Sequence, residues 1–284
     1  MKVGVTGAGG QLGRLVVQKL LERGRPEDIV AIVRDRMKVA DLAEAGVEIR
    51  VAVYDDRQAL DAAVAGLDKL LLISSSEVGH RVLQHKNVID AAKAAGVKHL
   101  IYTSAPKATT STLVVAPEHK ATEEYLLASG LPYTILRNNW YTENYAQAIR
   151  TAATKGELVA AVGAARVASA SRADYAEAAA AVLLGEGHEG RIYELSGDRA
   201  WDYRELADVI AEVTGRPCTY KAVTPPELVA VMVAAGVDEA MAKGAAALEA
   251  SIAEGGLAEA TPDLAALIGR PPTPLKETVT KVLG

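Results

Sequence analysis

The feature that most constrains this chain is its N-terminal run, in which a short apolar strand leads into three evenly spaced glycines and then a helix. Val3 and Val5 alternate with small residues, as in a buried strand. Gly7, Gly10 and Gly13 follow with the spacing G-x-x-G-x-x-G, ahead of a helical stripe of leucine and valine. A strand, a glycine turn and a helix in this order predict a dinucleotide-binding start.

Each glycine of this turn has its own role in such a site. The first lets the chain turn sharply after the strand, the second lets the backbone approach a pyrophosphate, and the third lets the helix pack closely on the strand. The helix N-terminus then presents free N–H groups and a partial positive charge to the phosphates. We expect the cofactor contacts of this turn to come from Gly7, Ala8, Gly9, Gly10, Gln11 and Leu12.

Strands and helices alternate six times over the first 137 residues. This predicts an α/β fold of the Rossmann type, with a doubly wound parallel sheet. Beyond Arg137 the alternation loosens into helices, a short strand near Leu158 and one more sheet strand at residues 192–195. We therefore predict a cofactor-binding Rossmann core of residues 1–137 and 172–197. A smaller, mostly helical, substrate-side lobe of residues 138–171 and 198–284 is interleaved with it.

Composition limits the partners and the location of the protein. A net charge of −5 argues against a nucleic-acid binder that works by neutralising phosphates. The single cysteine, Cys218, cannot form an internal disulfide, and the first strand begins too early for a signal peptide. No apolar run is long enough to cross a bilayer. The expectation is a cytoplasmic protein without a nucleic-acid or membrane partner and without a metal site, with a homodimer left open.

The residue after the second strand bears on the choice of cofactor. Arg34 stands about twenty residues past the glycine turn, where an NAD enzyme usually carries a carboxylate for the ribose 2′-hydroxyl. An arginine there can pair with a 2′-phosphate instead. NADH stays open as an alternative, because Asp35 follows directly and because Arg34 could be a solvated loop residue. The sequence predicts NADPH, with NADH as the weaker alternative.

Small and polar residues follow the later strands. Ser74, Ser75 and Ser76 end the fourth strand and can lie under a ribose and a nicotinamide, or cap the next helix. The sixth strand is followed by amide, aromatic and carboxylate side chains, at the place where nicotinamide and substrate would meet. Alternatively, the aromatic rings belong to the core and the first asparagine forms a turn. These residues, with Ser169 later in the chain, complete the predicted cofactor site: Asn138, Asn139, Trp140, Tyr141, Thr142 and Glu143.

Several segments together resemble the NmrA-like atypical short-chain dehydrogenases. The segments are the glycine turn, residues 70–79, residues 133–138 and 140–144, and the late runs 171–176 and 267–271. Within that family the chain is most similar to the bacterial NAD(P)H:quinone oxidoreductases of the second type, with the triphenylmethane reductases as near relatives. The resemblance covers essentially the whole chain. Two segments depart from the family: Val53 stands where an acidic residue would face the adenine, and residues 105–116 are more polar than in relatives.

The acid of ordinary short-chain dehydrogenases is missing. Those enzymes use a Tyr-x-x-x-Lys pair to protonate an alkoxide, and none of the ten tyrosines here has a lysine four residues later. His119 lies near the expected lysine position and is a candidate donor, although a packing role is the commoner one for such a histidine.

A quinone needs less help than an isolated carbonyl, because its conjugated ring spreads the charge of the incoming hydride. The predicted function is NADPH-dependent hydride transfer to a small flat quinone-like acceptor. Asn138 and Tyr141 are the expected catalytic residues, acting by orientation. Ser75 and Trp140 would line the same site. The alternative is a non-catalytic NADP(H)-binding redox sensor of the NmrA type.

Overall fold

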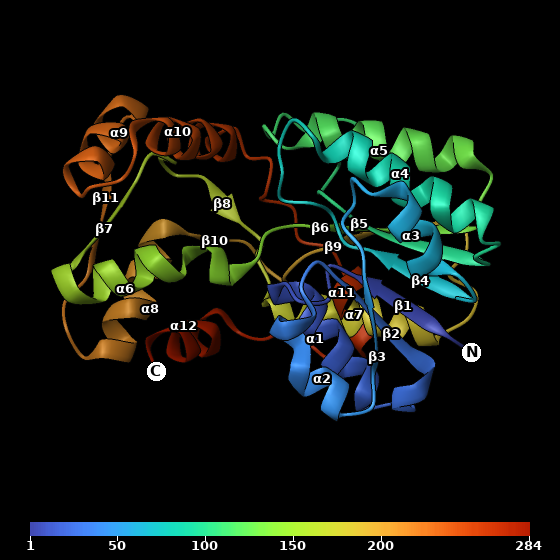
Figure 1. Cartoon of the computed structure of the whole chain (residues 1–284). Helices are drawn as coiled ribbons and strands as arrows, with labels where there is room; N and C mark the ends of the chain where they lie inside the picture. The colour runs from blue at the N-terminus through green and yellow to red at the C-terminus, as the bar shows by residue number, and fades with distance from the viewer.

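A seven-stranded parallel sheet forms the centre of the larger part of the protein, in a computed structural model that describes residues 1–284 (Figure 1). The strand order is β3-β2-β1-β4-β5-β6-β9, so the chain starts in the middle of the sheet and winds outward in both directions. This confirms the predicted doubly wound fold. The strands are β1 (Val3–Thr6), β2 (Ile29–Val33), β3 (Glu48–Val51), β4 (Lys69–Leu72), β5 (His99–Ser104), β6 (Tyr133–Asn138) and β9 (Arg191–Leu195).

Helices cover both faces of this sheet, so its central strands are buried on both sides and consist mostly of apolar residues. One apolar core lies between the sheet and the helices α1 (Gln11–Leu21), α2 (Ala40–Glu44), α7 (Arg172–Leu184) and α11 (Asp263–Ile268). A second core lies on the other face, under α3 (Arg57–Val64), α4 (Arg81–Ala94) and α5 (Ala116–Ser129). The carboxyl ends of the strands are left to the connecting loops, where a ligand can bind.

The smaller part has a core of its own, which includes a cluster of aromatic rings around Trp201 and Tyr203. Its helices are α6 (Ala146–Lys155), α8 (Tyr203–Thr214), α9 (Pro225–Ala234), α10 (Glu239–Ala253) and α12 (Leu275–Leu283). They surround two two-stranded sheets, one of β7 (Glu157–Ala160) with β11 (Thr219–Ala222) and one of β8 (Arg166–Val167) with β10 (Trp201–Asp202). The predicted lobe boundaries stay a prediction; α11 packs on the larger part through Leu264 and Ile268.

Two helices begin with 3₁₀ turns, and the small sheets contain strands that were not predicted. The turn Arg36–Val39 precedes α2, and Asp35 accepts the Met37 N–H there at 2.9 Å. The turn Thr142–Tyr145 precedes α6. The strands β8, β10 and β11 were not predicted, because two to four residues carry too little periodicity to identify a strand.

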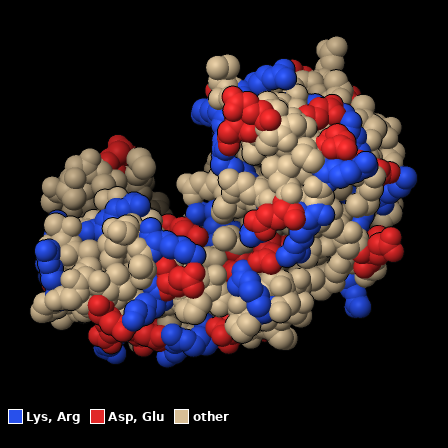
Figure 2. Space-filling model, turned by 90° about the horizontal axis from the view of Figure 1, so that it is seen from below, with Lys and Arg blue, Asp and Glu red and all other residues tan.

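Charged side chains are dispersed over the surface. Figure 2 shows basic and acidic groups interspersed on the face seen from below, and a notch between the larger and the smaller part. Many of these charges are paired, for example Arg57 with Asp61 and Lys276 with Glu212. None of the helices combines the length and the apolar character required to cross a bilayer.

Candidate functional site

The glycine turn between β1 and α1 has the geometry expected of a phosphate cradle. Gly7 is left-handed, with φ +60°, so the chain reverses directly after the strand. A Cβ placed on Gly13 would lie 2.3 Å from the Gly7 carbonyl oxygen, which means that only glycine permits this approach of helix and strand. No side chain caps the N-terminus of α1, so its N–H groups are free for a ligand. These residues fit the pyrophosphate of a dinucleotide.

The residues of this turn divide into two groups. Gly9, Gly10 and Gln11 are exposed at the carboxyl edge of the sheet, where a phosphate can reach them. Ala8 and Leu12 are buried, so their side chains belong to the core and only their backbone faces the turn. Their predicted contact with the cofactor is therefore limited to main-chain atoms.

Tyr54, which follows β3, was not among the predicted site residues. Its hydroxyl donates to the Ile73 carbonyl at 2.8 Å and lies 2.5 Å from Thr6 Oγ1, so it ties together the ends of β1 and β4 beneath the glycine turn. Burial raises the pKa of this hydroxyl, which keeps it protonated. The neighbouring Val53 is 39% exposed, as a surface residue of this edge. Only its place directly after a strand could have identified Tyr54 in the sequence.

Arg34 reaches across the mouth of the nucleotide site. Its guanidinium lies 3.2 Å from the Glu77 carboxylate. Arg34 follows β2 and Glu77 follows β4, and β1 lies between these two strands, so the ion pair spans the end of β1. Arg34 is 72% exposed, which leaves it free to exchange Glu77 for a phosphate.

We expect Arg34→Ala to weaken NADPH binding about tenfold more than NADH binding, because only NADPH carries a 2′-phosphate for the guanidinium. Fluorescence titration of both cofactors measures this difference. Arg25→Ala is the matched control, since Arg25 is 71% exposed, pairs with Asp28 and stands at the opposite end of β2. Equal weakening of both cofactors by Arg34→Ala would show that Arg34 does not read the phosphate.

The serine loop after β4 is held from below by buried side chains. The Ser75 N–H donates to His85 Nε2 at 2.9 Å, and Arg81 Nε donates to the Ser75 carbonyl at 2.7 Å. The Ser74 N–H donates to Thr103 Oγ1 at 2.9 Å. The backbone of the loop is therefore fixed, while Ser76 is exposed at the surface. His85 and Arg81 could not be identified from the sequence, because they lie on the helix that follows the loop.

His119 belongs to this buried network and not to the substrate side. Its Nδ1 lies 2.8 Å from the Tyr102 hydroxyl and its Nε2 lies 3.3 Å from Arg81. Burial, with the nearby Arg81 charge, lowers the pKa of His119 to about 3. The imidazole is therefore neutral at pH 7 and carries no labile proton for a substrate, which favours the packing role.

Asn138 and Tyr141, the predicted catalytic pair, contact each other after β6. Asn138 Nδ2 donates to the Tyr141 hydroxyl at 3.0 Å, while Asn138 Oδ1 is buried without a partner. The Tyr141 ring packs edge-on against Tyr175, and the Arg172 guanidinium lies 4.8 Å from its centroid. Burial raises the pKa of the Tyr141 hydroxyl, so it is a weaker proton donor than a free tyrosine.

The rest of this run makes contacts inside the protein. Thr142 Oγ1 lies 2.8 Å from Ser169 Oγ, which accepts the indole N–H of Trp201 at 2.9 Å. Both Glu143 carboxylate oxygens accept the Arg172 N–H at the start of α7. Trp140 packs against the core of the smaller part. These contacts join the two parts of the protein, and the predicted cofactor contacts of this run stay predictions.

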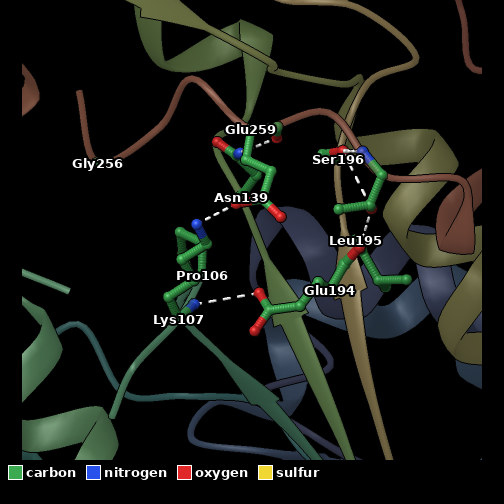
Figure 3. Close-up of a pocket in the computed structure, with 9 residues that line it drawn as sticks. Pro106, Lys107, Asn139, Glu194, Leu195, Ser196, Gly256 and Glu259 are labelled. Carbon is green, nitrogen blue, oxygen red and sulfur yellow. Dashed lines mark hydrogen bonds and ion pairs between the residues drawn. The ribbon is translucent and has the colours of Figure 1, made fainter. Parts of the chain in front are cut away.

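A small polar cavity lies beside Asn139, past the carboxyl ends of β5, β6 and β9 (Figure 3). Its volume is about 20 Å³, enough for one water-sized group. Asn139 Nδ2 donates to the carbonyls of Leu257 and Glu259, while its Oδ1 is buried without a partner. The wall contains one hydrophobic residue, so the cavity suits a polar group. It is lined by Pro106, Lys107, Asn139, Glu194, Leu195, Ser196, Gly256, Glu259 and Thr261.

Comparison with known proteins agrees with this arrangement. Residues 7–186, which begin at the glycine turn, match a family model described as NAD(P)H-binding. The chain belongs to the NAD(P)H-binding family. Within the family it is 45% identical to quinone oxidoreductase 2 of Escherichia coli, over 98% of this chain and 97% of that protein.

Two solved structures of the family have nearly the same fold. One is the NADPH-dependent quinone oxidoreductase of Escherichia coli in complex with NADPH, with a TM-score of 0.95, 44% identity, and coverage of 99% of this chain and 100% of that one. The other is the triphenylmethane reductase of a Citrobacter species, with a TM-score of 0.96, 39% identity, and coverage of 100% of this chain and 99% of that one. The resemblance stated from the sequence is confirmed.

Proposed function

We propose that this protein is an NADPH-dependent reductase of quinone-like acceptors. The observation that carries the proposal is the juxtaposition of a free α1 N-terminus with Arg34 across the end of β1. This geometry suits a dinucleotide with an additional phosphate. Support comes from the 45% identity to a quinone oxidoreductase over nearly the full chain, and from the similar fold of an NADPH complex.

The residues then divide by task. The glycine turn and Arg34 bind the phosphates, the Ser74–Ser76 loop lies under the ribose and nicotinamide, and the segment after β6 faces the acceptor. Residues 138–171 and 198–284 form the substrate-side lobe, and Asn139 and Gly256 of this lobe line the polar cavity together with residues of the core. When bound, NADPH supplies a hydride, and the protein holds the acceptor ring against it.

We expect steady oxidation of NADPH, followed at its absorbance band, with benzoquinones, naphthoquinones and triphenylmethane dyes as acceptors, and slower oxidation of NADH. The reductase needs an acceptor for its hydride, so a reaction mixture without an acceptor, in which NADPH is not oxidised, is the control. Tight NADPH binding without turnover on any acceptor would instead favour a redox sensor of the NmrA type.

A further inference from the structure

Lys107, which follows β5, has the only left-handed backbone conformation outside glycine in this protein, with φ +47°. This backbone conformation is unfavourable for a residue that carries a side chain, and such residues persist where the surroundings fix them. The Lys107 N–H donates to Glu194 Oε2 at 3.1 Å, and its carbonyl accepts the N–H groups of Thr110 and Ser111 at 2.8 Å each. The loop is therefore held in a conformation that directs this lysine to the polar cavity (Figure 3).

The Lys107 ammonium is the basic group of the cavity wall and pairs with the Glu259 carboxylate. The side chain is 48% exposed, so it can exchange this partner. The other carboxylate, Glu194, pairs with Arg137 at 2.8 Å, and Arg137 also holds the buried Glu123. Asn139, whose Oδ1 is buried without a partner, lines the same cavity. An oxygen atom that enters the cavity can thus accept a hydrogen bond from the ammonium.

The other acidic protons near these strand ends are unsuitable. Ser104 Oγ donates to the buried Glu123 carboxylate at 2.6 Å, away from the cavity. The buried Tyr141 hydroxyl is a weakened acid, and His119 is neutral and within the core. Arg172 lies beside Tyr141, but an arginine does not release its proton at neutral pH, so Lys107 is the cationic proton donor that the loops after β5 and β6 offer.

Resting on the proposed function, we propose that the Lys107 ammonium protonates the oxygen of a quinone-like acceptor and so decides between two classes of hydride acceptor. An O–H bond forms at one oxygen of the quinone with the hydride pair that NADPH would supply from its C4–H bond, and the other oxygen is left as an anion. That oxygen then takes a proton from Lys107, whose Nζ–H bond breaks, and the lysine regains a proton from water next to Glu259. The products are the hydroquinone and NADP⁺.

A cationic triphenylmethane dye makes different demands. Its central carbon accepts a hydride and becomes neutral, so no proton is needed. Lys107 therefore serves the neutral, oxygen-bearing acceptors and contributes no chemical step to reduction of the dye cation.

The test compares Lys107→Met, Lys107→Arg and wild type on a naphthoquinone and on a triphenylmethane dye. We expect Lys107→Met to lower kcat for the quinone about tenfold to a hundredfold, with a much smaller change for the dye. Lys107→Arg keeps the charge but does not release its proton at neutral pH, so its kcat for the quinone stays low. Lys93→Met, an exposed lysine on α4, is the matched control.

A second readout is independent of turnover. The anion of 2-hydroxy-1,4-naphthoquinone resembles the oxyanion left after hydride transfer, and its binding can be followed by absorbance. Lys107→Met should weaken its binding about tenfold and Lys107→Arg should retain it, while NADPH affinity stays constant in both. Circular dichroism verifies the fold of each variant.

The outcomes separate the two proposals. A wild-type protein that reduces neither acceptor overturns the proposed function. If the wild-type protein reduces both the quinone and the dye, the role of Lys107 is overturned when Lys107→Met loses both activities equally or loses neither of them. If Tyr141→Phe loses activity with quinones alone and Lys107→Met keeps that activity, the proton comes from Tyr141 instead.

Discussion

Replacing Gly13 with alanine is expected to lower NADPH affinity at least a hundredfold and the free energy of unfolding by about 3 kcal/mol or more. The added Cβ would lie 2.3 Å from the Gly7 carbonyl oxygen and 2.7 Å from Ala8 Cα. Both are backbone atoms, so no side-chain rotation relieves the overlap. The start of α1 must move away from β1, and the phosphate cradle moves with it.

Urea unfolding and NADPH titration measure the two effects. Gly244→Ala, inside α10, is the matched control, because its Cβ meets no atom within 4 Å and alanine favours a helix. Gly10→Ala should lie between the two, since its Cβ would be 3.2 Å from the Gly7 oxygen. Normal NADPH affinity in Gly13→Ala would mean that α1 does not pack on the turn in this way.

Mild acid is expected to destabilise the protein through His85 and His119. Burial is the main cause that lowers the pKa of each to about 3, against 6.5 for an ordinary histidine. Between these values the unfolded chain binds protons that the folded protein does not. The stabilisation is complete above pH 6.5 and is lost as the pH falls, with a slope that approaches about 1.4 kcal/mol per pH unit for each histidine.

Denaturant unfolding at several pH values between 5 and 7 gives this slope. His119→Gln should reduce it by the share of one histidine, whereas His80→Gln, at an exposed position, should leave it unchanged. Thermal unfolding at pH 7 checks that His119→Gln is folded. A slope that is the same in wild type and in His119→Gln would mean that His119 is protonated in the folded protein.

The larger part of the protein could be predicted from the sequence because its signals are local. Strands β1 and β4 are short apolar runs, and Gly130 ends α5 in the left-handed conformation that its position predicts. The glycine turn fixes its own geometry, since Gly7 and Gly13 contact each other within one supersecondary unit. In contrast, of the small-sheet strands only β7, near Leu158, was predicted; β8, β10 and β11 are short and pair across long sequence separations, such as Thr219 with Glu157.

The doubly wound fold, the position of the dinucleotide turn and the lack of a Tyr-x-x-x-Lys pair could all be predicted from the sequence, because each depends on residues close together in the chain. The partners of the side chains could not, because they depend on how the chain folds back on itself. The tertiary structure placed Glu77 against Arg34, His85 and Arg81 beneath the serine loop, and Glu143 on the start of α7. It also brought Lys107, Asn139 and Glu259 around one cavity. Lys107 and Asn139 meet because β5 and β6 end at the same edge of the sheet, and the segment between α10 and α11 brings Glu259 to them.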